Sequence, residues 1–195
     1  MSELRALVTG ASSGVGMATA RMIHARGGAV ALVARRADAL AELAAGLGDR
    51  AFAFPCDVSV PEAVAGVVAE AFDTLGGLDL VVNAAGINGP ATPEEVTPEK
   101  WATTIGVNLT GTFWVAREAA LRMGSGGSIV NLGSELALIG MERYVDYCAS
   151  KFGVIGVTKA MAAELAPRGI RMRSVRGRSA RRCWRRSSST SRIPN

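Results

Sequence analysis

The sequence predicts an α/β protein whose parallel sheet is covered by helices on both faces. Short apolar segments alternate along the chain with longer segments of helical periodicity. The apolar segments are rich in Val, Leu and Ala without polar alternation, as burial on both faces of a sheet requires. A chain of 195 residues is long enough to bury one sizeable core. We therefore expect one doubly wound domain with roughly six parallel strands.

The pattern places each element of this sheet. Strands are predicted at 5–10, 29–34, 51–55, 78–86, 127–134 and 169–175. Helices are predicted at 14–27, 36–48, 61–75, 98–123 and 145–167, and two glycines at 27 and 28 are expected to end the first of them. No internal repeat is present, and the break in composition falls at Arg171.

The net charge of +5 hides two unlike parts of the chain. Residues 171–195 hold nine arginines, six serines and no acidic residue, a net charge of +9. Residues 1–170 hold 13 basic and 17 acidic residues, a net charge of −4, and give no electrostatic reason to expect nucleic acid as a partner. We expect a nucleotide-binding domain over 1–171 and an Arg/Ser-rich tail over 172–195, whose composition is typical of disorder.

The composition favours a cytoplasmic protein that binds no membrane. No apolar run approaches the ~18 residues of a membrane-spanning helix, and the N-terminus leads directly into the first strand rather than into a signal peptide. Three widely spaced cysteines predict neither a disulfide framework nor a metal site. The single histidine, His24, lies in a helical pattern and is expected to have an ordinary surface or packing role.

A glycine-rich turn joins the first strand to the first helix. Glycines without Cβ let backbone amides approach a pyrophosphate, and the N-terminus of the following helix favours the negative charge. The alternative is a tight turn without a ligand. We predict a dinucleotide site formed by Thr9, Gly10, Ser12, Ser13, Gly14, Val15 and Gly16.

Two arginines follow the second strand, at a point that distinguishes NAD from NADP. A carboxylate there would bind the ribose 2′-hydroxyl, whereas a cation favours the 2′-phosphate. Here Ala34 is followed by Arg35 and Arg36, and guanidinium groups match phosphate geometry. We predict NADP(H) as the cofactor. The alternative for Arg36 is that it is simply solvated at the start of the helix.

A tyrosine, a lysine and a serine form a candidate catalytic group. Tyr147 and Lys151 are at i and i+4, and therefore on one face of a helix. A nearby ammonium stabilises a phenolate and lowers its pKa from about 10 toward the working range. Ser134, at the end of the fifth strand, would bind and position the substrate oxygen. The Tyr-x-x-x-Lys spacing also occurs by chance in helices, so this motif alone leaves both interpretations open.

Together these motifs resemble the short-chain dehydrogenase/reductase family over residues 4–171. The chain carries TGxxxGxG at Thr9–Gly16, NAAG at Asn83–Gly86, and the YxxxK pair 13 residues after Ser134. Asn108 in "IGVNLTGTF" and Asp57 in "CDVS" match two further positions of the family. The resemblance implies a Rossmann-like fold and hydride transfer between NADP(H) and a small-molecule carbonyl or alcohol substrate.

The resemblance also implies roles for individual residues. Tyr147 would act as the acid–base group, while Ser134 polarises the carbonyl and Lys151 binds the nicotinamide ribose. Asn108 would anchor a water that leads protons to Lys151. Ordinary capping is the alternative for Asn108 and for Asn83. The remaining cofactor contacts are expected from Asp57, which would face the adenine ring, and from Val58, Asn83, Ala84 and Gly86.

The resemblance does not name a substrate. Its pocket would be shaped by the loop after Ser134 and the loop after Gly86, and Glu135, Met141 and Tyr144 are candidates for lining it. The helices that hold Asn108 and Tyr147 match a family interface, so a homo-oligomer through them is a further hypothesis.

The tail departs from the family pattern. The Pro-Gly and the Thr that family members carry after this point are missing beyond Arg171. Our hypothesis is a shifted reading frame near residue 171, because one alternative frame, with free choice of codons, restores both features. The competing interpretation is a basic arm for nucleic acid or an acidic membrane. Either way, the second hypothesis for function is an inactive nucleotide-binding remnant of such an enzyme.

Overall fold

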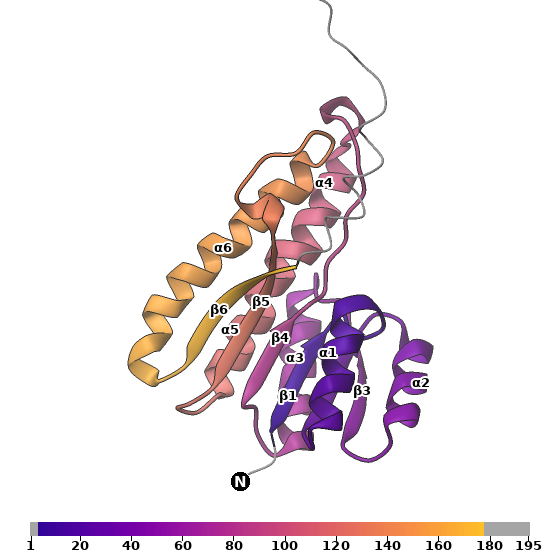
Figure 1. Cartoon of the computed structure of the whole chain (residues 1–195), viewed down its shortest axis with the longest axis vertical. Coiled ribbons are helices and arrows are strands. Elements are labelled where there is room, and N and C mark those ends of the chain that lie inside the picture. Colours follow the sequence, from indigo (N-terminus) through magenta and orange to yellow (C-terminus); the bar gives the residue numbers. More distant parts are fainter. Residues whose placement is uncertain (1–3, 178–195) are drawn as a thin grey trace, which may run out of the picture.

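The predicted strands all form, and they assemble into one six-stranded parallel sheet (Figure 1). The computed structural model describes residues 4–177. The strands are β1 (Arg5–Thr9), β2 (Ala29–Ala34), β3 (Ala51–Pro55), β4 (Leu80–Asn83), β5 (Ser128–Ser134) and β6 (Arg171–Gly177). The helices are α1 (Gly14–Ala25), α2 (Ala37–Leu47), α3 (Pro61–Leu75), α4 (Pro98–Ile105), α5 (Gly111–Arg122) and α6 (Val145–Leu165). Single 3₁₀ turns lie at Pro93–Glu95, Glu135–Ala137 and Ala166–Arg168.

The sheet has the order β3-β2-β1-β4-β5-β6, and every neighbouring pair is parallel. This is the doubly wound Rossmann order, in which the winding reverses between β1 and β4. In such sheets a crevice opens at the carboxyl ends of the strands at the reversal, and ligands bind there. The structure therefore confirms the predicted fold class and marks the edge of the sheet where a site is expected.

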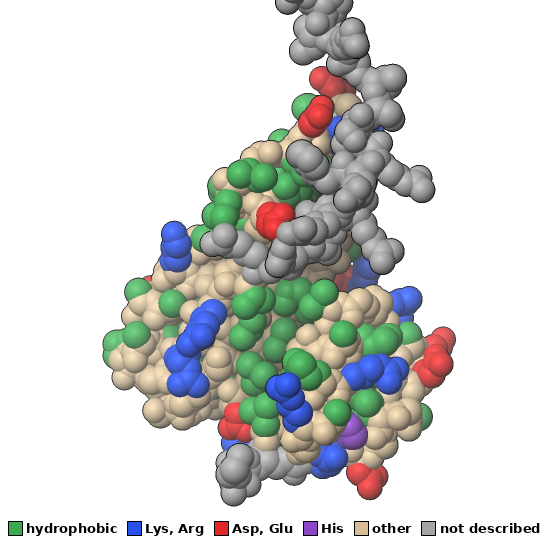
Figure 2. Space-filling view, in the orientation of Figure 1, with side chains coloured by type: hydrophobic (Ala, Val, Ile, Leu, Met, Phe, Trp, Pro, Cys, Tyr) green, Lys and Arg blue, Asp and Glu red, His purple; other side chains and the backbone are tan. Residues whose placement is uncertain are grey.

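Helices cover the two faces of the sheet unequally. On one face α1 and α2 pack on β1, β2 and β3 around a core that includes Val8 and Leu32. On the other face α3, α5 and α6 form a larger core that includes Leu7 and Val81. Figure 1 shows no described helix in front of β5 and β6, and Figure 2 shows hydrophobic side chains gathered over the middle of that face.

The predicted helix at 98–123 contains an irregularity that the pattern did not reveal. Between α4 and α5 lies a π-helical turn, Gly106–Thr110, which widens the helix by one residue. Directly after this turn, Gly111 packs against the loop that follows β3. A Cβ on Gly111 would lie 2.8 Å from the Val58 carbonyl oxygen. This turn holds Asn108, whose side chain is fully buried.

The sixth strand runs past the domain boundary expected at residue 171. It pairs with β5 along its whole length, from Ser128 opposite Arg171 to Ser134 opposite Gly177. Met172 is buried against α6, and this packing with the ladder hydrogen bonds outweighs the local Arg/Ser composition. The expectation of a disordered tail from residue 172 is thus corrected for 172–177. The rest of that predicted tail, 178–195, lies outside the described residues.

Local sequence explains where the helices near the site begin. Pro61 and Pro98 stand in the first turns of α3 and α4, where the missing N–H costs no helical hydrogen bond. Thr97 caps α4, and its hydroxyl accepts a hydrogen bond from the Lys100 amide at 3.2 Å.

Among residues 4–177, no helix is both long and apolar enough to cross a membrane.

Candidate active site

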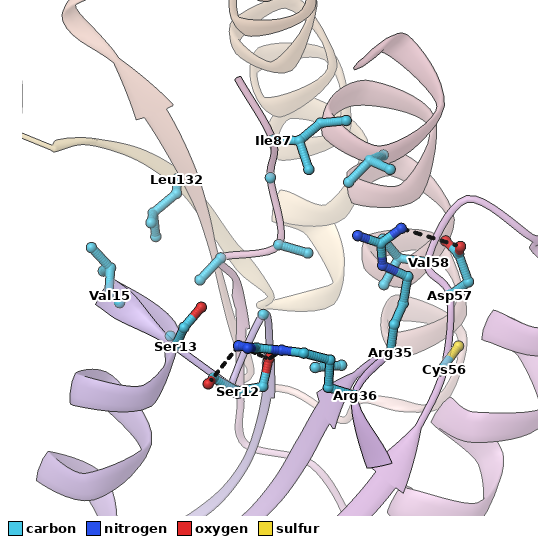
Figure 3. A pocket seen from close by; sticks show the side chains of 18 residues that line it. Ser12, Ser13, Val15, Arg35, Arg36, Cys56, Asp57, Val58, Ile87 and Leu132 are labelled. Carbon is cyan, nitrogen blue, oxygen red and sulfur yellow. Dashed lines mark hydrogen bonds and ion pairs between the residues drawn. The ribbon is translucent and has the colours of Figure 1, made fainter. Parts of the chain in front are cut away.

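A cavity of about 450 Å³ opens at the carboxyl ends of the strands, at the reversal between β1 and β4. Its wall comes from the β1–α1 turn and from the segments that follow β2, β3 and β4 (Figure 3). Most of the residues predicted to bind the cofactor lie on it: Gly10, Ser12, Ser13, Gly14, Val15, Gly16, Arg35, Arg36, Asp57, Val58, Ala84 and Gly86.

The glycine-rich turn is packed too closely for side chains at two positions. Gly10 has a φ of 66°, and a Cβ there would lie 2.8 Å from the Ala84 carbonyl oxygen. A Cβ on Gly16 would lie 2.4 Å from the Gly10 carbonyl oxygen. Thr9 is buried behind the turn, and its hydroxyl accepts hydrogen bonds from the amides of Ala84 and Ala85, both at 3.1 Å. The turn is thus locked against the end of β4, with its backbone exposed toward the cavity.

The two arginines after β2 have different partners (Figure 3). Arg36 reaches back to the glycine-rich turn, where its guanidinium donates to the carbonyl oxygen of Ser12 at 3.0 Å and to the Ser12 hydroxyl at 3.1 Å. Arg35 points the other way, and its Nη1 lies 4.0 Å from Oδ2 of Asp57. Both line the cavity, so two cations stand where the ribose 2′ position of a dinucleotide is expected.

Asp57 is held ionised beside Arg35. The Ser59 hydroxyl donates to Asp57 Oδ1 at 2.7 Å and the Ser59 amide at 2.9 Å. The hydroxyl hydrogen bond, with smaller contributions from the amide and from Arg35, lowers the pKa of this carboxyl below its usual value. The side chain is therefore an acceptor at the far end of the cavity from the glycine-rich turn.

A smaller cavity of about 190 Å³ adjoins the larger one and holds the predicted catalytic group. Ser134, Tyr147 and Lys151 all line it. The two cavities share five residues: Val15, Ala84, Gly86, Ile87 and Leu132. The fold therefore brings together a serine from β5, a tyrosine and a lysine from α6, and the end of the larger cavity.

Burial sets the proton affinities of Tyr147 and Lys151. Burial raises the pKa of the Tyr147 phenol, and a hydrogen bond with Ser134 offsets part of this effect. Burial also lowers the pKa of Lys151 to about 8, while its Nζ donates to the Leu132 carbonyl oxygen at 2.7 Å. The lowering of the Tyr147 pKa by Lys151, expected from the sequence, is not found, because desolvation of the phenol dominates and Nζ lies over the ring, 5.7 Å from its centroid.

Like Thr9, the predicted site residues Asn83 and Asn108 lie behind the cavity walls rather than on them. Asn108 is fully buried, and its side chain accepts from the Ile87 amide at 2.8 Å and donates to the Ile87 carbonyl at 2.9 Å. Asn83 Nδ2 donates to Asn131 Oδ1 at 2.9 Å. Asn108 therefore holds the backbone of the loop after β4, whereas Asn83 links β4 to β5, and a water-anchoring role for Asn108 stays a prediction.

Of the two loops expected to shape the substrate pocket, the one after Gly86 lines the smaller cavity, whereas the candidates after Ser134 do not. Glu135, Met141 and Tyr144 are not among the described residues that line either cavity, although Tyr144 packs edge-on against Tyr147 with ring centroids 6.2 Å apart. Ile87 and Asn88 of the loop after Gly86 line the smaller cavity, together with Leu132 of β5. Ile87 and Asn88 belong to the loop directly after the NAAG motif, while Leu132 lies inside β5, two residues before its end. The apolar side chains of Ile87 and Leu132 carry no chemistry that the sequence could reveal.

The comparison with known proteins identifies the family. The sequence pattern of the short chain dehydrogenases matches residues 5–177. The chain is 42% identical over 179 residues to the D-threitol dehydrogenase of Mycolicibacterium smegmatis, a match that covers 87% of this chain and 67% of that protein. It is 40% identical over 173 residues to nodulation protein G of a Rhizobium species, covering 88% of this chain and 71% of that protein. The chain belongs to the short-chain dehydrogenase/reductase family.

Solved structures agree with this assignment. A short chain dehydrogenase from Burkholderia cenocepacia, in complex with NADP, superimposes with a TM-score of 0.85 at 36% identity and covers 89% of this chain and 73% of that one. A short-chain type dehydrogenase/reductase from Mycobacterium marinum gives a TM-score of 0.84 at 37% identity, over 90% and 74% of the two chains. The family to which the chain belongs uses NAD or NADP and comprises oxidoreductases.

Proposed function

We propose that the chain is an oxidoreductase that transfers a hydride between NADP(H) and a carbonyl or alcohol substrate, with Tyr147 as the acid–base group. The observation that carries this proposal is the junction of the two cavities. The cleft that fits a dinucleotide opens directly into the smaller cavity, which is lined by Ser134, Tyr147 and Lys151.

The residues of the larger cavity fit a nicotinamide dinucleotide. The close approach of backbone at Gly10 and Gly16 leaves the turn free of side chains where a pyrophosphate needs amide donors. Arg35 and Arg36 offer cations for a 2′-phosphate, which favours NADP over NAD. A bound nicotinamide dinucleotide would supply or accept the hydride.

The side chains of the smaller cavity would handle the proton and the substrate oxygen. In the reductive direction Tyr147 donates its phenolic proton to the oxygen of the reduced carbonyl. Ser134, hydrogen-bonded to Tyr147, donates to the same oxygen and orients it. Lys151 then restores the Tyr147 proton, because an ammonium with a pKa of about 8 is a stronger acid than a phenol whose pKa is raised.

The first prediction tests Tyr147 directly. Tyr147→Phe removes the proton donor and is expected to lower turnover by at least about a thousandfold, the scale on which loss of an acid–base group acts, while the NADPH Kd stays unchanged. Turnover is measured with NADPH over a panel of ketones. Tyr144→Phe is the matched control, since Tyr144 lies one turn away and lines neither cavity. Full turnover in Tyr147→Phe would rule out Tyr147 as the acid–base group. If the wild-type protein binds NADPH but reduces no ketone, the inactive remnant is favoured.

The second prediction tests the cofactor. Arg35→Ala and Arg36→Ala each remove a charge-assisted contact of ~1.5–3 kcal/mol, so the NADPH Kd should rise roughly 10- to 100-fold and the NADH Kd little. Fluorescence titration with both cofactors measures this. Arg21→Ala, on α1 and away from both cavities, is the control. Equal wild-type affinity for NADH and NADPH would contradict the preference for NADP.

A further inference from the structure

A buried carboxylate stands directly before the catalytic tyrosine. Asp146 lies in the first turn of α6 and is 1% exposed. Its Oδ1 accepts the Tyr147 amide at 2.9 Å, and its Oδ2 accepts the Thr104 hydroxyl at 2.8 Å. A helix cap alone would use only the first of these contacts, whereas the second oxygen is committed to α4.

The same oxygen is paired with a lysine of α4 that has a second partner. Lys100 Nζ lies 3.3 Å from Asp146 Oδ2 and donates to the Gly89 carbonyl oxygen at 3.0 Å. Gly89 follows Ile87 and Asn88, which line the smaller cavity. One ammonium therefore joins the helix that carries Tyr147 to the loop that lines the same cavity.

The segment after Gly86 is anchored at three places, and at the last of them the Ala91 amide donates to the Arg143 carbonyl oxygen at 2.8 Å, just before α6. At its beginning, both backbone polar groups of Ile87 are bound by the side chain of Asn108. Between these two places, Lys100 binds Gly89. Since Tyr147 and Lys151 line the same cavity as Ile87 and Asn88, the Asp146–Lys100 contact links two segments that bound the space a substrate would enter.

We propose that Asp146 is a positioning residue for Tyr147, which acts through Lys100 to hold loop 87–89 at a fixed distance from the first turn of α6. The proposal rests on the proposed function, because it holds that this contact fixes the position of Tyr147 relative to a bound substrate. Asp146 touches no substrate and is not itself catalytic.

The charges at Asp146 are consistent with a contact that is kept closed. Burial raises the pKa of the Asp146 carboxyl, but hydrogen bonds from Thr104 and the Tyr147 amide, together with Lys100, outweigh it and leave the pKa below its usual value. A buried carboxylate that keeps its charge requires its partners in place, and removing one of them leaves an unpaired buried charge. Opening of the Asp146–Lys100 contact is therefore strongly disfavoured.

The first test measures whether the two segments are joined, independently of activity. Lys100→Met and Asp146→Asn should each speed amide hydrogen exchange roughly tenfold or more, both at 87–91 and at 145–148. The double variant should add little to either single one. Glu118→Gln is the matched control: Glu118 is also a buried carboxylate, paired with Arg117 and Arg122 on α5, and it lines neither cavity. Faster exchange confined to one of the two segments in Lys100→Met would overturn the proposal. This variant decides the question even if Asp146→Asn fails to fold.

The second test measures the consequence for the reaction, with diacetyl and cyclohexanone as carbonyl probes and turnover normalised to sites titrated by NADPH. In Lys100→Met we expect turnover per titrated site to fall about tenfold, as small misplacements of reacting groups do, and the KM for the probe to rise while the NADPH Kd stays unchanged. Unchanged turnover per site would mean that the cluster only stabilises the fold, and would overturn the proposal. A wild type that reduces no carbonyl would contradict the proposed function, while the exchange comparison would still decide whether the two segments are joined.

Discussion

At the scale of single residues, burial brings the proton affinities of Lys151 and Tyr147 into the order that the reaction needs. Desolvation disfavours both charged forms, so the ammonium becomes a stronger acid and the phenol a weaker one. In the proposed mechanism, transfer of a proton from Lys151 to the Tyr147 phenolate is therefore downhill. The lysine remains largely protonated at pH 7, since its pKa is about 8.

The lowered pKa of Lys151 predicts how stability depends on pH. An unfolded lysine keeps its proton up to a pKa of about 10.5, whereas the folded one loses it near 8. Between these values the unfolded state binds more protons, so the free energy of unfolding rises with pH, by on the order of 3 kcal/mol over the whole window. Below pH 8 both states are protonated and the penalty of burying the charge is fully present.

Chemical denaturation of the wild type and of Lys151→Met from pH 7 to pH 10.5 measures this contribution. The difference between the two proteins isolates Lys151, because the raised pKa values of Cys56 and Tyr147 act in both and in the opposite direction, lowering stability as pH rises. We expect the advantage of Lys151→Met to shrink as pH increases. A constant difference across the window would mean that the lysine is not desolvated.

The identity of these residues was predictable from the sequence, but their electrostatics were not. The i, i+4 spacing of Tyr147 and Lys151 needs only the helix period. The direction of the Tyr147 pKa shift depends on how much water reaches the phenol, which follows from packing by segments distant in the sequence. For this reason the expected lowering by Lys151 was wrong.

At the scale of elements, the turn between β1 and α1 and the π-helical turn before α5 hold the site together. The first was visible in the sequence, because glycines at fixed positions after a strand have a specific geometric cause. The second was not, since nothing in the helical period of 98–123 marks a π turn. The π-helical turn places Asn108 in the interior, where its side-chain amide forms hydrogen bonds with both the backbone N–H and the backbone carbonyl of Ile87.

The close contact at Gly16 makes a prediction at this scale. Gly16→Ala would place a methyl group 2.4 Å from the Gly10 carbonyl oxygen, so α1 must shift from the end of β1. We expect a loss of roughly 1–3 kcal/mol in the free energy of unfolding, as in other overpacked sites, together with loss of measurable NADPH binding.

A second glycine supplies the control. Gly46 lies inside α2, with open space where its Cβ would be. Gly46→Ala should therefore stabilise the protein by about 0.5–1 kcal/mol and leave NADPH binding unchanged. Thermal unfolding and cofactor titration of both variants give the two readouts. Normal cofactor affinity in Gly16→Ala would show that the turn can relax and that the contact is not needed.

At the scale of the whole molecule, the sheet order could be expected but its uneven covering could not. Parallel strands alternating with helices predict a doubly wound sheet, and TGxxxGxG after the first strand places the cleft. Which helix covers which strand depends on packing between elements. On the side of α1 and α2, Val130 and Leu132 of β5 are only partly buried, and Val175 of β6 is 44% exposed.

Two valines on adjacent strands test this asymmetry with the same substitution. Val81 of β4 is fully buried in the core beneath α3, α5 and α6, whereas Val130 faces the other side of the sheet and is partly buried. Val81→Ala should cost about 2–3 kcal/mol, because it leaves a cavity in a packed core, and Val130→Ala less than about 1 kcal/mol, because water already reaches the site. Urea denaturation of both variants measures the difference. Equal costs would mean that in solution this face of β5 is covered, either by chain outside residues 4–177 or by a second copy. Repeating the measurement over a range of protein concentrations separates the two, because only cover by a second copy depends on concentration.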